Sequence, residues 1–165
     1  MNLGTLWQSL ETSGVGTFVA ESAWAFPLLE SLHVIALVTV VGSIAIMDLR
    51  LLGLAGRGWT VTALSRDTLP LTWGAFVLAA ITGGLLFVSR ATTYVINPWF
   101  LVKMVLLVLA GVNMAILHSF AWKSVHQWDS TASVPTAAKV AGGLSLVFWI
   151  LVVFCGRVIG FTLAV

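Results

Sequence analysis

The residues of this chain with the most distinctive chemistry are its histidines, two of which, His33 and His118, lie within long apolar stretches. Neutral imidazole is the commonest protein ligand of haem iron. A haem with two histidine ligands needs both of them at one depth, on facing helices. His33 comes early in the first stretch and His118 late in the third, which runs in the same direction, so a rise of about 1.5 Å per residue separates them by roughly 20 Å. We therefore do not expect them to share one haem, and His126 falls in a loop.

Methionine spacing offers another arrangement. Met47 follows His33 by 14 residues, and His118 follows Met104 by 14. Because this spacing is close to four helical turns, each pair shares one helix face. His33 would then share its depth with Met104, and Met47 with His118, which allows two His/Met sites for haem b. The same methionines are also typical of gap-filling in an apolar core.

Charged groups inside a bilayer are costly, so each is a candidate site. We call the side on which the first stretch begins the outer side; the polar groups near it are Glu30, His33, Arg90, Lys103 and Arg157. Those near the inner side are Asp48, Arg50, Asn113 and His118. The outer set could hold haem propionates or a quinone head group through charge-assisted hydrogen bonds. Alternatively, both sets only lock the helices together, with Glu30 paired to a cation and Asp48 to Arg50 or a helix end.

The elements that must position these groups are membrane-spanning helices. Of 165 residues, 59% are hydrophobic and 8% charged, with a mean hydropathy of +1.06. A chain this poor in charge cannot cover a water-facing surface, which excludes a soluble enzyme, a disordered tail and a nucleic-acid binder. Four apolar segments are each long enough to cross a bilayer. They run over about 27–56, 70–90, 98–122 and 137–161.

Short connections between these segments predict an all-α, polytopic membrane protein whose residues 27–165 form an antiparallel four-helix transmembrane bundle. Residues 1–26 contain no Lys or Arg and mix aromatic residues with Ser, Thr and Gly. This composition predicts an interfacial helix or a short cap, and not a secretory signal. The lone Cys155 excludes an internal disulfide.

The distribution of basic residues predicts the orientation. The inner side holds Arg50, Arg57, Arg66, Lys123 and Lys139. The outer side holds Arg90, Lys103 and Arg157. This excess favours a cytoplasmic inner side, with both termini in the periplasm of a bacterium.

Several short motifs carry a resemblance to a known family. The most specific are WAFPLLESLH over 24–33 and MDLRLLG over 47–53, and the others are LLFVSR over 85–90, Asn97-Pro98 with Lys103, and Gly156-Arg157. They resemble a family of small four-helix bacterial inner-membrane proteins classed as a domain of unknown function. The resemblance implies the fold and a bacterial inner-membrane location, and supplies no activity. A fainter likeness links the early-helix histidine to cytochrome b561-like and copper-resistance-D-like membrane proteins, although those cytochromes pair histidines at matching depths.

We therefore expect a small integral membrane protein that binds b-type haem or associates with a quinone in electron transfer, and that is not a stand-alone enzyme. The candidate cofactor-binding residues are His33, His118, Met104, Met47, Glu30, Lys103, Arg90 and Arg157, the two histidines being candidate iron ligands. Two alternatives are a cofactor-free structural or accessory subunit of a membrane complex, and a small transporter. The expected partners are the lipid bilayer with a quinone, a membrane protein or a second copy of the chain.

Overall fold

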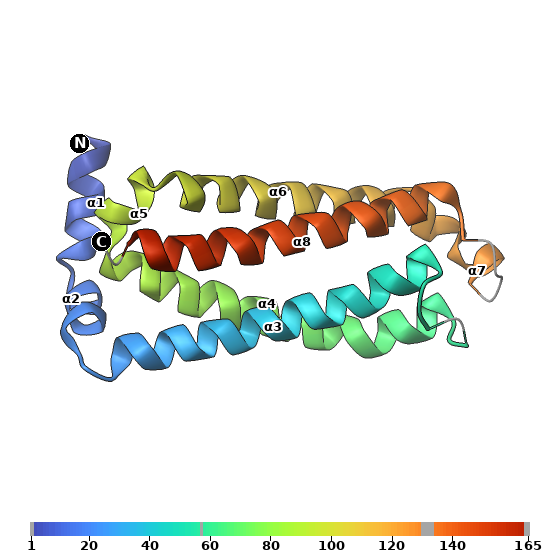
Figure 1. Cartoon of the computed structure of the whole chain (residues 1–165), viewed down its shortest axis with the longest axis horizontal. Helices are drawn as coiled ribbons and strands as arrows, with labels where there is room; N and C mark the ends of the chain where they lie inside the picture. The colour runs from blue at the N-terminus through green and yellow to red at the C-terminus, as the bar shows by residue number, and fades with distance from the viewer. Residues whose placement is uncertain (1, 57, 130–133, 164–165) are drawn as a thin grey trace.

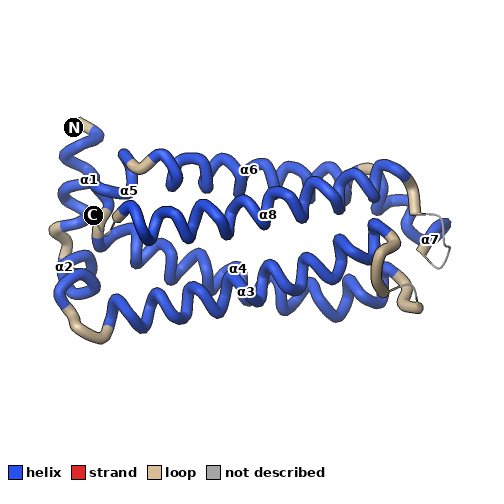
Figure 2. The backbone as a smooth tube through the Cα atoms, viewed as in Figure 1, coloured by secondary structure: helices blue, strands red, loops and turns tan. Residues whose placement is uncertain are grey.

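Four long helices make up the body of the protein in the computed structural model, which describes residues 2–56, 58–129 and 134–163 (Figure 1). They are α3 (Ala25–Leu52), α4 (Val61–Ser89), α6 (Pro98–Ser119) and α8 (Thr136–Thr162). Each is long and apolar enough to cross a membrane, and the described residues contain no strand (Figure 2). The chain is a multi-pass, all-α membrane protein, and the predicted fold class is confirmed.

The four helices do not pack equally on one another. α3 packs along both α4 and α8, and α8 also packs along α6. Within the described residues, α4 and α6 make no comparable contact. The bundle therefore has a seam, lined on α4 by Trp73 and Phe76 and on α6 by Gly111 and Met114.

Two apolar clusters fill the interior. One lies midway along the bundle and includes Val40, Leu106, Trp149 and Val152. The other lies at what we call the distal end, away from the two chain termini, which share the opposite end (Figure 1). The distal cluster joins Leu51 and Val61 to residues of the short helices η1 (Ala121–Ser124) and α7 (Val125–Trp128) and of the start of α8.

Two helix boundaries differ from those predicted by the sequence. α4 begins at Val61 rather than at Pro70, which lies inside the helix. Its start is fixed upstream because the Thr60 side chain accepts a hydrogen bond from the backbone N–H of Ala63, at 3.2 Å. α3 ends at Leu52 rather than near residue 56, because Gly53 takes a left-handed conformation (φ 73°) that terminates helices.

The N-terminal segment forms two short helices, α1 (Leu3–Glu11) and α2 (Gly14–Glu21), across the end of the bundle that holds the termini (Figure 1). They contact α3, α4 and α5 (Ala91–Ile96). Trp7 of α1 meets the ring of Phe87 edge-on, with the ring centroids 5.8 Å apart. This segment is therefore packed against the bundle as a cap.

The basic residues predicted to share one side lie at the distal end, in or beside the connections between helices. They are Arg50 in the last turn of α3, Arg66 in α4, Lys123 in η1 and Lys139 in α8. Arg57, the fifth, lies outside the described residues.

Candidate functional site

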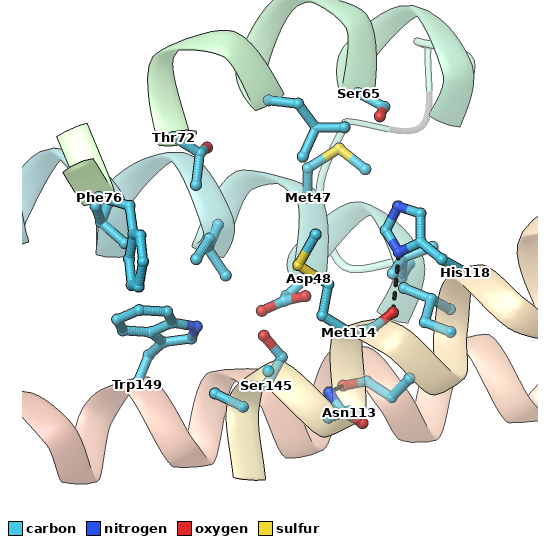
Figure 3. Close-up of a pocket in the computed structure, with 18 of the residues that line it drawn as sticks. Met47, Asp48, Ser65, Thr72, Phe76, Asn113, Met114, His118, Ser145 and Trp149 are labelled. Carbon is cyan, nitrogen blue, oxygen red and sulfur yellow. Dashed lines mark hydrogen bonds between the residues drawn. The ribbon is translucent and has the colours of Figure 1, made fainter. Parts of the chain in front are cut away.

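A cavity of about 180 Å³ lies among the four long helices in the distal half of the bundle (Figure 3). α3 and α8 form its floor, and α4 and α6 its two sides. It opens along the seam, where Trp73 is 50% exposed and Phe76 is 38% exposed. Because the outer faces of these helices meet lipid, the opening leads sideways into the bilayer.

Asp48 is the central polar residue of this cavity. Its side chain comes from α3, is only 5% exposed and points into the space, with the Ser145 hydroxyl of α8 facing it (Figure 3). Among the described residues, its Oδ2 atom has no hydrogen-bond partner. A buried polar atom without a partner costs about 1–3 kcal/mol, so this oxygen is an unusual feature of the interior.

The suggested ion pair between Asp48 and Arg50 is not formed. Residues two apart on a helix point to different faces, so the two side chains diverge. Arg50 is buried and turns toward the distal loops, where its Nε donates to the carbonyl oxygen of Trp59 at 2.8 Å. Its Nη2 donates to the carbonyl oxygen of Asp129 at 3.3 Å.

His118 borders the same cavity from the last turn of α6. Its Nδ1 lies 2.9 Å from the carbonyl oxygen of Met114 (Figure 3). A carbonyl oxygen only accepts hydrogen bonds, so Nδ1 carries the proton, and the neutral ring keeps a lone pair on Nε2. The ring also stacks on Trp122, with the centroids 5.1 Å apart. His118 is thereby held with one ring nitrogen free to accept.

Met47 lines the cavity together with His118, so the structure brings these two predicted residues to one site. The space is close to that of an engineered protein cavity of about 150 Å³ that binds benzene. A haem macrocycle is several times larger than a single ring. Binding of haem by His118 and Met47 would therefore require α4 and α6 to move apart.

The second predicted pair, His33 and Met104, is not brought together. The His33 ring faces α4, where its Nδ1 lies 3.0 Å from the Thr82 hydroxyl oxygen. It also packs over Gly83, since an ideal Cβ at that residue would lie 2.8 Å from His33 Cε1. Met104 lies on α6, a helix with which α3 has no extended packing in the described residues, and is 37% exposed.

No salt bridge in the described residues joins the other predicted outer residues to one another. Lys103 is half-buried against α8, its Nζ 3.6 Å from where a Cβ of Gly156 would lie. Arg90 and Arg157 are exposed and lie over the rings of Phe26 and Phe161, respectively. Glu30 is exposed, and the expected ion pair with a cation is absent from the described residues, whose one salt bridge joins Arg66 to Asp67 at the surface.

The sequence predicted one inner cluster of Asp48, Arg50, Asn113 and His118, of which all but Arg50 line the cavity, and it did not indicate the residues that shape the cavity around them. Those residues include Ser65, Thr72, Phe76, Met114, Ser145 and Trp149. A signal existed on α4, where Ser65, Thr72 and Phe76 follow at intervals of seven and four residues and so share one helix face. No group of three or more His, Cys, Asp or Glu side chains able to hold a metal ion occurs in the described ranges.

Comparison with protein-family models, curated proteins and solved structures gives no match to this chain. The fold and the site therefore define the class by themselves: a four-helix, multi-pass membrane protein with a cavity open to the bilayer. Its function has to be argued from the residues of that cavity.

Proposed function

We propose that this protein binds the ring of a membrane-soluble quinone-class carrier in the distal cavity, as the quinone-associated module of an electron-transfer system in a bacterial inner membrane. The observation that carries the proposal is a ring-sized space, open to lipid, that contains a buried carboxylate oxygen with no hydrogen-bond partner among the residues that the structure describes. Size, wall chemistry and polar groups each support it.

The first support is the fit between the cavity and a single substituted ring. At about 180 Å³ the space slightly exceeds one that accepts benzene. The rings of Phe76 and Trp149 lie next to one another in its wall (Figure 3), and Trp73, also in the lining, is 50% exposed. Aromatic side chains bind flat rings by edge and offset contacts. An apolar tail on such a ring would leave between α4 and α6 into the bilayer.

The second support is the position of the polar groups. Asp48 Oδ2 and the Nε2 lone pair of His118 are both available to bind the oxygens at the edge of the ring. Asn113 fixes this region, because its amide donates to the carbonyl oxygen of Ala141 at 2.9 Å and ties α6 to α8. Binding pockets commonly combine apolar walls with a few such polar groups.

The alternatives account for less of the geometry. A purely structural subunit accounts for the hydrogen bond between Asp48 and Ser145, which links α3 to α8, but leaves the Oδ2 atom of Asp48 unexplained. A transporter needs a route across the membrane, whereas the apolar cluster of Val40, Leu106, Trp149 and Val152 fills the bundle toward the end with the termini. A b-type haem on His118 and Met47 is the second candidate, favoured by their shared cavity.

The orientation completes the proposal. We assign the distal end to the cytoplasm, because Arg50, Arg66, Lys123 and Lys139 gather there and basic residues are retained on that side. The cavity then lies in the cytoplasmic half of the bilayer, with both termini in the periplasm.

Binding of methylhydroquinone and methylbenzoquinone to the detergent-solubilised protein, measured by equilibrium dialysis, tests the proposal. Gly111 lines the cavity and an added Cβ would meet nothing within 4 Å, so Gly111→Leu adds a large side chain at the cavity wall without a backbone clash. Gly160→Leu is the matched control, since Gly160 has equally open surroundings away from the cavity.

We expect saturable binding that weakens at least tenfold in Gly111→Leu and is unchanged in Gly160→Leu. Absence of saturable binding, or equal binding by both variants, would remove the proposal.

A visible spectrum of the protein purified from haem-replete cells tests the second candidate, the binding of b-type haem. A Soret band that shifts on reduction and is lost in His118→Ala would favour haem, and a colourless protein would exclude it.

A further inference from the structure

The distal cavity is open along the seam between α4 and α6 and closed on the side of α3 and α8. We infer from this shape and from its volume that it accepts a head group of one ring, as in a benzoquinone. A naphthoquinone head group, which has two fused rings, is excluded. This inference rests on the proposed function and names the class of its ligand. It concerns binding only, in either redox form.

The burial of the lining residues shows which side of the cavity is closed. The exposed residues of the lining are Trp73 and Phe76 on α4 and Gly111 on α6. None of the lining residues from α3 or α8 is exposed, and Leu51 and Trp149 are only 1% and 7% accessible. The opening to lipid therefore lies between α4 and α6, and the cavity ends at the two helices opposite.

The closed side is tightly packed. An ideal Cβ at Gly142 of α8 would lie 3.2 Å from the Cβ of Leu51 and 3.3 Å from the backbone oxygen of Asp48, both on α3. Val40 and Trp149 belong to the apolar cluster midway along the bundle, and Leu51 belongs to the distal cluster. Protein interiors are packed about as densely as organic crystals, so this wall cannot recede to enlarge the cavity.

The volume of the cavity separates the two head groups. At the packing density of protein interiors, about 0.74, a space of about 180 Å³ holds roughly 130 Å³ of atoms. By van der Waals volume, a methyl-substituted benzoquinone of about 125 Å³ fits this space, whereas the corresponding naphthoquinone of about 165 Å³ does not. The second ring therefore needs room that the cavity does not provide.

An apolar tail determines where the second ring must lie. In a tailed naphthoquinone, the tail and the second ring are attached to opposite edges of the quinone ring. A tail that leaves along the seam therefore turns the second ring toward α3 and α8, where the cavity is closed. The second ring cannot then project through the opening into lipid.

The test is equilibrium dialysis of the detergent-solubilised full chain with two ligands that differ only in the second ring. They are a benzoquinone and a naphthoquinone, each with a methyl and a butyl group on adjacent carbons of the quinone ring. Protein-free detergent gives the background for partition into micelles. Because the second ring adds apolar surface, the naphthoquinone would bind more tightly without a size limit. We expect the reverse, with the benzoquinone bound at least tenfold more tightly.

Trp149→Phe enlarges the closed side of the cavity. The change removes roughly 40 Å³ of side chain, which is about the volume of the second ring. The preference for the benzoquinone should fall at least fivefold in this variant, through tighter binding of the naphthoquinone. Trp99→Phe is the matched control, because Trp99 contacts Phe154 and lies outside the cavity lining. The wild-type ratio decides by itself if Trp149→Phe does not fold.

The outcomes separate the two claims. If neither ligand binds saturably, the proposed function fails. If the naphthoquinone binds as tightly as the benzoquinone, quinone-class binding stands and the selection of a single ring is overturned. A preference that is unchanged in folded Trp149→Phe would overturn it as well, because the closed side of the cavity would then not set the limit.

Discussion

Asp129, which follows α7, caps the start of α4. Its carboxylate accepts hydrogen bonds from the backbone N–H of Thr62, at 2.8 Å, and from the Thr62 hydroxyl. The first N–H groups of a helix lack partners within the helix, so this contact satisfies one of them and places a negative charge at the positive end of the helix dipole. The carbonyl oxygen of the same residue accepts from Arg50. Asp129 therefore joins the connection after α7 to the ends of α3 and α4.

Replacing Asp129 by Ala should lower the free energy of unfolding by about 1 kcal/mol, the usual effect of losing a helix cap. Asp129→Asn keeps an oxygen that can accept from Thr62 and should be milder. Thermal unfolding in detergent, followed by circular dichroism, measures both. Asp67→Ala is the control for loss of an exposed acid, and an equal effect in that variant would contradict the capping role.

The cap formed by α1 should loosen in acid. The Thr92 hydroxyl and backbone N–H both donate to Glu11, at 3.0 Å for the N–H, and these bonds hold the pKa of the Glu11 carboxyl below its usual value. A lowered pKa in the folded state means that the stabilisation is complete above the unfolded value of about 4.3 and is lost as the pH falls through the folded one.

Hydrogen exchange of the α1 amides against pH measures this loosening. Exchange in α1, corrected for its intrinsic pH dependence, should rise below about pH 4 in the wild type, and Glu11→Gln should remove that step. Glu21→Gln, a change in an exposed acid of α2, should retain it. A step that persists in Glu11→Gln would assign the loosening to another group.

The contact between His33 and Gly83 should tolerate no added methyl group. A Cβ at Gly83 would lie 2.8 Å from His33 Cε1, so Gly83→Ala forces α3 and α4 apart or turns the ring away from Thr82. We expect destabilisation of about 1–3 kcal/mol. Gly84→Ala, where a Cβ meets nothing within 4 Å, should be close to neutral. Combining Gly83→Ala with His33→Ala in a double-mutant cycle should recover part of the loss, and strict additivity would contradict direct contact.

The length of the apolar segments and the scarcity of charged residues made the fold predictable, because few structures other than a helix bundle allow such a chain to pair its backbone groups in a bilayer. The helix boundaries were less predictable. Pro70 suggested a helix start, whereas the caps that determine the start of α4 come from Thr60 and from Asp129, 67 residues away from Thr62 in the chain. A contact of that separation leaves no local pattern in the sequence.

For the candidate site, the sequence predicted the depth of each residue along its helix, but not which side chains face one another. The rise per residue of an α-helix was enough to place Met47 and His118 at the same depth in the bundle, and both line the cavity. The rotation of each helix about its axis is set by packing, so the sequence did not show that His33 faces α4 while Met104 lies on α6. Nor did it show that α4 and α6 stay apart, which creates the cavity.

Asp48→Leu should make the protein more stable while removing the proposed ligand binding. The substitution replaces a buried carboxylate, one oxygen of which lacks a partner in the described residues, by an apolar side chain for which the cavity has room. Relief of that desolvation predicts a gain of about 1–3 kcal/mol in the free energy of unfolding. Functional sites commonly carry such a stability cost. Thermal unfolding and methylhydroquinone dialysis on the same preparation measure the two effects, with Asp67→Leu as the control. A large loss of stability in Asp48→Leu would instead mean that the carboxylate holds the helices together. The inner polar residues would then have the purely structural role that the sequence offered as an alternative.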